Sequence, residues 1–201
     1  SYGTGARVQK ELPDCTVLDG CIYVSASLEH PGVLVQHGPI LRVVFGPRDP
    51  SYISPILSAI QSDLCESGID GVLSTHIQRD ALEKFSYVSP IGAAGVYLHA
   101  VAGDFQKEGP ARELFKSMIR EISALAAAMG YPFEKDYVKI NLEILSNLSA
   151  DATTSMQRDI MEGKPSELDG LVMEPLRLAK KYSVSMPCYE EVAKVLCPLE
   201  F

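Results

Sequence analysis

The sequence is organised around Thr153-Thr154-Ser155-Met156-Gln157-Arg158-Asp159 and the following Glu162-Gly163-Lys164-Pro165-Ser166-Glu167-Leu168-Asp169. These residues predict the end of one helix, a sharp turn and the start of a second helix. Gly163 suits the left-handed position just past a helix, and Pro165 cannot continue that helix. Ser166 and Asp169 have the spacing of a capping box, so we expect Ser166 to cap the second helix.

A hydroxyl and a carboxylate stand out within these two stretches. Glu167 would fall at the first position of the second helix, where a carboxylate complements the positive end of the helix dipole. A structural role of this kind is enough to explain an acidic residue. Ser155 lies close to the start of the first helix, so we also expect Ser155 and Glu167 to face one cleft.

The length, composition and charge of the chain limit the classes of protein to which it can belong. The 201 residues suffice for one large domain or two small ones, and 46% of them are apolar and 22% charged, as in ordinary globular proteins. The formal net charge of -8 argues against a nucleic-acid partner, because no basic surface is available for phosphates. No apolar run is long enough to cross a bilayer, so no membrane partner is expected.

Cysteine and histidine usage predicts neither a disulfide framework nor a metal site. The odd number of cysteines and the absence of a C-x-x-C pattern favour free thiols in a reducing cytoplasm, where we expect the protein to reside. The histidines lack metal-ligand spacing, so no metal is predicted. The residues concerned are Cys15, Cys21, Cys65, Cys188 and Cys197, and His30, His37, His76 and His99.

The N-terminal part has mixed helix and strand patterns. A short helix is predicted at 6–12, two strands within 15–37, a third strand at 42–45 and a short strand at 72–73. Short turns between the first strands favour antiparallel pairing. A helix is predicted over 51–67, and its apolar face carries Ile53, Ile56, Leu57, Ile60 and Leu64.

From about residue 76 the pattern becomes entirely helical. Helical periodicity runs from 77 to about 102, although Pro90, Gly92 and Gly95 are expected to bend or loosen it. Further helices are predicted at 110–129, from 134 or 136 to 148, at 153–162, at 166–182 and at 188–196. The change from mixed α/β to all-α predicts a domain boundary near residue 76.

The string T-S-M-Q-R-D-I-M-E-G-K-P-S-E-L-D at residues 154–169 resembles the signature of the ketopantoate reductase (2-dehydropantoate 2-reductase) family. That signature is S-S-M-x-x-D followed by R/K-P-T-E-I/L-D. The similarity extends along the chain. Residues 18–39 are similar to late strands of the family's Rossmann domain, 81–85 to the W-x-K-L segment with the catalytic lysine, and 184–189 to a C-terminal V-x-x-P motif.

The resemblance implies a fold and a division of the chain. Residues 1–75 would be the C-terminal part of an NADP-binding Rossmann domain. Residues 76–201 would be a helical substrate-binding and dimerisation domain with a 6-phosphogluconate dehydrogenase C-terminal-like fold. The chain would then be the last two thirds of such a protein. We expect it to lack the G-x-G-x-x-G loop that binds most of NADPH, and to be inactive alone.

The resemblance also implies a reaction and its residues. Family members transfer a hydride from NADPH to the C2 carbonyl of ketopantoate, giving pantoate for pantothenate and coenzyme A biosynthesis. Lys84 would polarise the carbonyl and donate the proton. Glu167 would hold the Lys84 ammonium and contact the substrate and cofactor. Ser155 would contact the substrate, and Gly3, in a G-x-G that is weak evidence by itself, would contact the cofactor.

Four positions depart from the family pattern. Tyr2, Val88, Gly92 and Ala152 stand where the family has asparagines that hold the substrate. Loss of these amides favours a different substrate specificity, since sites built on hydrogen bonds discriminate strongly. Reduction of another 2-keto acid therefore stays open. So do a non-catalytic interaction protein and a homodimerisation module built from the helical domain.

Overall fold

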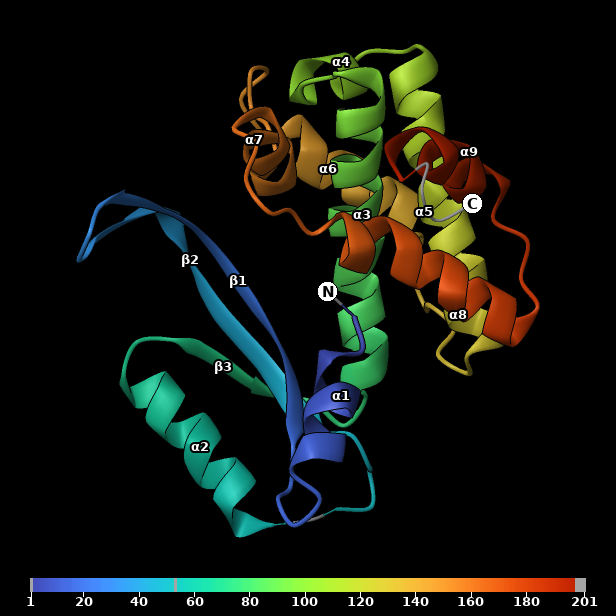
Figure 1. Cartoon of the computed structure of the whole chain (residues 1–201). Coiled ribbons are helices and arrows are strands. Elements are labelled where there is room, and N and C mark those ends of the chain that lie inside the picture. The colour runs from blue at the N-terminus through green and yellow to red at the C-terminus, as the bar shows by residue number, and fades with distance from the viewer. Residues whose placement is uncertain (1, 53, 198–201) are drawn as a thin grey trace. The chain divides into compact units, whose positions relative to one another are not determined.

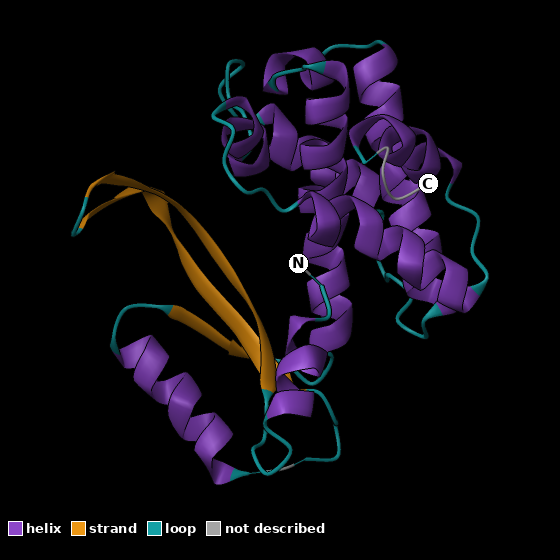
Figure 2. Cartoon of the chain, in the orientation of Figure 1, coloured by secondary structure: helices purple, strands orange, loops and turns teal. Residues whose placement is uncertain are grey.

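The computed structural model describes residues 2–52 and 54–197. The chain forms two compact units. One is Gly3–Ala81, and the other contains Tyr2 and the described residues from Leu82 onward. Figure 2 shows that the strands belong to the first unit and that the second is built from helices and loops.

The first unit is organised by a long hairpin. Strand β1 (Leu18–His30) pairs antiparallel with β2 (Val33–Pro47), as expected, through a turn in which Gly32 has a φ of 87°. The prediction of a separate third strand at 42–45 is wrong, because these residues and the end of the range 15–37 belong to one strand, β2. The register shifts between Val24 and Ala26, and Gly38, at a φ of 84°, lets the chain bulge and then resume the ladder.

A β-α-β unit completes the sheet. Helix α2 (Pro55–Glu66) leads from β2 to β3 (Asp70–Leu73), which pairs parallel with β2 in the sheet order β1-β2-β3. The helix begins later than predicted because Pro55 is well suited to the first helical turn. Ile53, predicted on its apolar face, lies outside the described residues. Cys21, Val44 and Ile77 form the small core of this unit.

The central helix of the second unit is α3 (Ile77–Leu98), which begins in the first unit and continues through Pro90 without a break. Proline has no N–H, so the carbonyl four residues earlier, that of Ser86, loses its helical donor. The buried side chain of Asn141 donates to that carbonyl at 3.0 Å and to the Ser86 hydroxyl at 3.1 Å. The compensating amide explains why α3 tolerates its proline.

The other helices surround α3 (Figure 1). They are α4 (Ala102–Gln106), α5 (Pro110–Ala128), α6 (Tyr137–Ser146), α7 (Ser155–Met161), the π-helical turn η1 (Asp169–Met173), α8 (Glu174–Tyr182) and α9 (Pro187–Leu196); α1 (Thr4–Glu11) belongs to the first unit. The helices predicted at 110–129 and 188–196 are thus present within one or two residues. Within the described ranges, no helix has the length and hydropathy that a membrane crossing requires.

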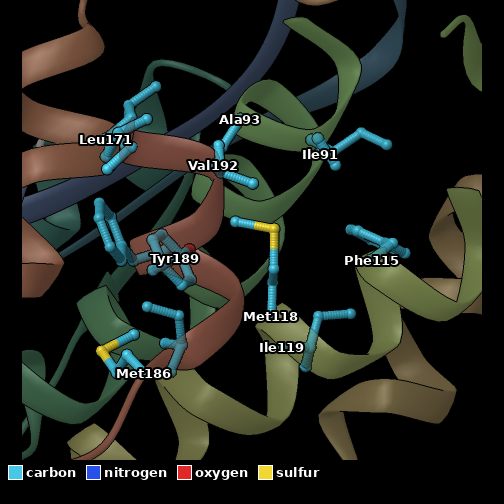
Figure 3. Close-up of a cluster of buried hydrophobic side chains, with 14 of the residues drawn as sticks. Ile91, Ala93, Phe115, Met118, Ile119, Leu171, Met186, Tyr189 and Val192 are labelled. Atoms are coloured by element: carbon cyan, nitrogen blue, oxygen red, sulfur yellow. The ribbon is translucent and has the colours of Figure 1, made fainter. Parts of the chain in front are cut away.

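The core of the helical unit lies between α3, α5, η1 and α9. Figure 3 shows Tyr189 and Val192 of α9 beside Leu171 of η1 and Met118 of α5. Glu121 of α5 accepts hydrogen bonds from the first amides of α9, at 2.8 Å from Cys188 and at 3.1 Å from the next residue. A carboxylate at a helix N-terminus complements the helix dipole, so α5 fixes the start of α9.

Candidate functional site

The start of α7 carries the first predicted site residue, Ser155. Ser155 is the first helical residue and its side chain is exposed. Thr154 is the N-cap: its hydroxyl accepts from the Gln157 amide at 3.2 Å, and the Gln157 side chain accepts from the Thr154 amide at 2.9 Å. This capping box was missed, although T-x-x-Q at 154–157 is its sequence signal.

Gln157 fixes α7 on α3. Its side chain is 8% exposed and its Nε2 donates to the Ala100 carbonyl at 2.7 Å. A Cβ on Gly95 would lie 2.7 Å from the Gln157 side-chain carbon, so only glycine leaves room for this contact. The position of Ser155 is therefore set by a buried amide two residues away.

The π-helical turn η1 is fixed on the same helix. The hydroxyl of Ser89, fully buried in α3, donates to the Leu171 carbonyl at 2.6 Å and accepts from the Tyr189 hydroxyl. A Cβ on Gly92 would lie 3.1 Å from Met156 Cε and 3.8 Å from Leu171 Cδ1. Helix α7, which begins at Ser155, and η1, which follows Glu167, thus both pack on α3 at Gly92.

Glu167 lies just before η1, and its side chain is exposed. The prediction that Ser166 caps this helix is wrong, because the cap position is Leu168 and no side chain bonds to it there. The Asp169 carboxylate instead accepts 2.8 Å hydrogen bonds from Arg177 of α8, so it is not available for a capping box. The hydrogen bonds that Arg177 donates to the Asp169 and Glu174 carboxylates raise the pKa of its guanidinium.

Lys84 lies half-buried on α3. Gly92, where α7 and η1 pack on α3, comes eight residues after Lys84, a rise of about 12 Å along a helix. The structure thus places Lys84 on α3, Ser155 at the start of α7 and Glu167 just before η1, and these three elements pack together in one unit. A direct contact between the Lys84 and Glu167 side chains stays a prediction.

Gly3 belongs to the other unit, where it is the N-cap of α1 with a φ of 82°. The second glycine of this G-x-G, Gly5, is needed for a steric reason. A Cβ at this position would overlap the Asp19 carboxylate, to which Arg48 donates a hydrogen bond at 2.6 Å. Both glycines thus have a structural explanation, and the contact of Gly3 with a cofactor stays a prediction.

The four positions that depart from the family pattern make mainly apolar or backbone contacts. The Tyr2 ring packs on Phe85 with centroids 6.4 Å apart. Val88 packs against the helical core, and Gly92 is buried beneath α7. Ala152 uses its carbonyl to accept from the Ala102 amide at 2.9 Å. The site therefore contains no amide side chain at these positions.

A cavity of about 230 Å³ lies in the helical unit beside the start of α7. Its walls come from α3, the α3–α4 connection, α4, α6 and the segment that precedes α7. The lining residues are Tyr87, Ile91, Ala100, Ala102, Phe105, Ile144, Leu148, Ala152, Thr153, Thr154 and Gln157. Sequence periodicity did not reveal this cavity, because its walls come from segments far apart in the chain.

Comparison with known proteins identifies this arrangement of helices. Residues 76–200 match the family model described as "Ketopantoate reductase PanE/ApbA C terminal", which covers more than half of the chain. The chain belongs to the ketopantoate reductase PanE/ApbA family. This confirms the predicted family and the predicted fold class, a short α/β part followed by the family's helical C-terminal domain.

Curated relatives are distant and longer than this chain. It is 21% identical over 189 residues to a 2-dehydropantoate 2-reductase of Nostoc, covering 92% of this chain and 59% of the relative. It is 22% identical over 176 residues to the uncharacterized oxidoreductase YkpB of Bacillus subtilis, covering 88% and 58%. The chain thus spans less than two thirds of the length of these relatives.

Solved structures share the fold. The 2-dehydropantoate 2-reductase of Methylococcus capsulatus has a TM-score of 0.86 at 23% identity, covering 98% of this chain and 63% of that one. A D-mandelate dehydrogenase solved with NADH has a TM-score of 0.83 at 19% identity, covering 99% and 67%. The same fold therefore occurs in enzymes named for different substrates.

Proposed function

We propose that this chain is the C-terminal part of an NADPH-dependent enzyme that reduces ketopantoate to pantoate, for pantothenate and coenzyme A biosynthesis. The observation that supports this proposal is the packing of α7, which begins at Ser155, and of η1, which follows Glu167, on the helix that carries Lys84 in the family's helical domain. Residues 76–201 would bind the substrate, and residues 1–75 would belong to the cofactor-binding domain.

Each matched residue has a role in this reaction. NADPH, when bound, supplies the hydride that adds to the C2 carbonyl carbon. The Lys84 ammonium stabilises the negative charge that develops on the carbonyl oxygen and gives it a proton. Glu167 orients that lysine, and Ser155, exposed at the start of α7, hydrogen-bonds to the substrate.

Two residues are proposed to contact the cofactor. Gly3 has no side chain to cap α1, so the backbone amides at that helix start suit an anionic group of NADPH. Glu167, exposed before η1, would contact the cofactor next to the substrate. The remaining cofactor contacts would come from a G-x-G-x-x-G loop outside this sequence.

A second candidate is the reduction of a different 2-keto acid. The apolar contacts of Tyr2, Val88 and Gly92 favour it, because the family holds its substrate with amides at these positions. A relative of this fold is described as D-mandelate dehydrogenase with NADH and anilino(oxo)acetate. A non-catalytic dimerisation module is the third candidate; a dimeric ketopantoate reductase is described from Staphylococcus aureus.

The test is NADPH oxidation by the full-length protein that contains this chain, with ketopantoate and a panel of other 2-keto acids. Lys84→Ala is expected to lower turnover by about 10²–10⁴-fold, the usual contribution of a general acid. Lys139→Ala, on the exposed face of α6, is the matched control. Turnover of another keto acid would favour the second candidate, and NADPH binding without any turnover would favour the third.

A further inference from the structure

The backbone ladder of α3 is interrupted close to the proposed catalytic lysine. Lys84 comes two residues before Ser86, whose carbonyl loses its helical donor because Pro90 has no N–H. Helix α7 packs on α3 after the proline, at Gly92 and Gly95, and η1 also contacts α3 at Gly92. The angle of α3 between Ser86 and Pro90 therefore determines where Lys84 lies relative to α7 and η1.

Asn141 of α6 supplies what the proline removes. Its Nδ2 donates to the Ser86 carbonyl at 3.0 Å and to the Ser86 hydroxyl at 3.1 Å, and that hydroxyl donates to the Glu83 carbonyl at 2.7 Å. Asn141 is 1% exposed and Ser86 is fully buried, so water does not compete for these bonds. A buried network thus joins α6 to the single turn, residues 83–86, that contains Lys84.

The network lies on the side of α3 that faces away from the lysine. At about 100° per residue, Ser86 lies about 200° around the helix from Lys84, and Pro90 lies about 40° from Ser86. Gly92 and Gly95 lie within about 80° of Lys84, on the side where α7 packs. Asn141 therefore supports α3 from behind and can act on Lys84 only through the helix backbone.

The two bonds from one amide do more than satisfy a carbonyl. A proline inside a helix usually produces a kink, because the ladder bond is lost and the ring crowds the preceding turn. One nitrogen that bonds to two atoms of Ser86 restricts both the distance and the rotation of this turn relative to α6. The angle at which α3 passes Pro90 is thus fixed by a neighbouring helix.

We propose that Asn141 is a positioning residue for Lys84, and that its amide holds the part of α3 before Pro90 at the angle that places the ammonium on the substrate carbonyl. The inference rests on the proposed function, since it requires Lys84 to be the proton donor. It adds α6 to the elements on which the reaction depends, although Asn141 itself does not touch the substrate.

The first test is the kinetics of Asn141→Leu in the full-length protein that contains this chain. Leucine has a similar size but no donor, so kcat with ketopantoate is expected to fall about tenfold to a hundredfold, the usual cost of a misplaced catalytic group. KM should change by no more than about threefold, because the lysine acts mainly on the transition state. Asn147→Leu is the matched control, because the exposed Asn147 amide bonds only within α6, to the Glu143 carbonyl at 2.8 Å.

The second test is rescue by a change in another helix. Pro90→Ala restores a backbone N–H opposite the Ser86 carbonyl, so the amide of Asn141 should no longer be needed. The double variant Pro90→Ala/Asn141→Leu is expected to have a kcat within about threefold of Pro90→Ala alone, a strong departure from additivity. A double variant as impaired as Asn141→Leu would mean that Asn141 acts by packing, and would overturn the inference. Wild-type kcat in Asn141→Leu would overturn it as well.

Loss of folding is controlled separately from loss of positioning. Circular dichroism and the Tm establish that each variant folds, and all rates are measured well below the lowest Tm. If Asn141→Leu does not fold, Asn141→Ser takes its place in the same cycle, because the serine hydroxyl is one bond shorter than the amide. A wild-type kcat for Asn141→Ser, or a loss that Pro90→Ala does not repair, would then overturn the inference.

A readout without catalysis separates this inference from the proposed function. Reductive methylation with a carbon-13 label gives lysines separate NMR signals, and the Lys84 signal is assigned by its absence in Lys84→Arg. If the wild-type protein reduces no keto acid, the proposed function fails. The inference on position then holds if the Lys84 signal shifts in Asn141→Leu and returns in the double variant. It is overturned if the signal does not move, whether or not ketopantoate is reduced.

Discussion

The hydroxyl of Ser89 in α3 donates a 2.6 Å hydrogen bond to the carbonyl of Leu171, inside the π-helical turn that begins at the last residue of the S-E-L-D segment. In a π-helix the backbone hydrogen bonds span one more residue than in an α-helix, so carbonyls within the turn become available to other donors. Ser89 thus joins the central helix to the turn that directly follows Glu167.

Removal of the Ser89 hydroxyl is expected to destabilise the helical unit. Ser89→Ala leaves the Leu171 carbonyl and the Tyr189 hydroxyl buried without this partner, so the free energy of unfolding should fall by about 1–3 kcal/mol in urea denaturation. Ser123→Ala is the control, because the Ser123 hydroxyl bonds only within its own helix. Equal effects of the two variants would contradict this account.

Two glycines of α3 are expected to respond differently to alanine. Gly95→Ala would place a Cβ 2.7 Å from the hydrogen-bonded Gln157 side chain and should cost about 1–3 kcal/mol. Gly92→Ala meets only the flexible end of Met156 at 3.1 Å, so the gain in helix propensity should offset most of its cost. A lower Tm for the Gly92 variant than for the Gly95 variant would refute the role of Gln157.

The thiol of Cys188 is expected to react slowly with alkylating reagents. Burial, reinforced by the Glu121 carboxylate, raises the pKa of Cys188 to about 11. A raised thiol pKa leaves less of the reactive thiolate at pH 8, so iodoacetamide should modify Cys188 on the order of a hundred times more slowly than the exposed Cys15. Mass spectrometry of timed samples measures both rates, and Glu121→Gln should accelerate the reaction at Cys188.

Glu167 is expected to matter for catalysis more than for folding. If its carboxylate orients the Lys84 ammonium, Glu167→Gln should lower kcat/KM with ketopantoate by about a hundredfold and leave the Tm within a degree or two, since the side chain is exposed. Glu162→Gln, in an exposed pair with Lys164, is the matched control. A similar loss in both variants would remove the specific role of Glu167.

Local signals predicted those elements whose ends are set by neighbouring residues. The helix at 110–129 was predicted closely because Pro110 starts it and Gly130 ends it with a φ of 89°. Helix α3 was expected to bend or loosen at Pro90, and the sequence could not indicate that Asn141, fifty-one residues later, supplies the missing donor. Distant partners of this kind are not visible in local patterns.

The same limit applies to the candidate site. The S-E-L-D segment has the spacing of a capping box, but Arg177 of the next helix binds the Asp169 carboxylate. The motif could be matched to a family, which identified Lys84, Ser155 and Glu167 as candidates. The cavity became visible only in the packed structure, because segments far apart in the chain form its walls.

The π-helical turn at Asp169–Met173 also determines the direction in which the residues before it point relative to α8. One residue of an α-helix corresponds to a rotation of about 100°, so a turn that holds one extra residue offsets everything before it by that angle relative to α8. Deleting Gly170 would convert the turn to an ordinary helical one and rotate Glu167 away from its present direction, while α8 could keep its own packing. The facing of this carboxylate thus depends on the number of residues in a single turn.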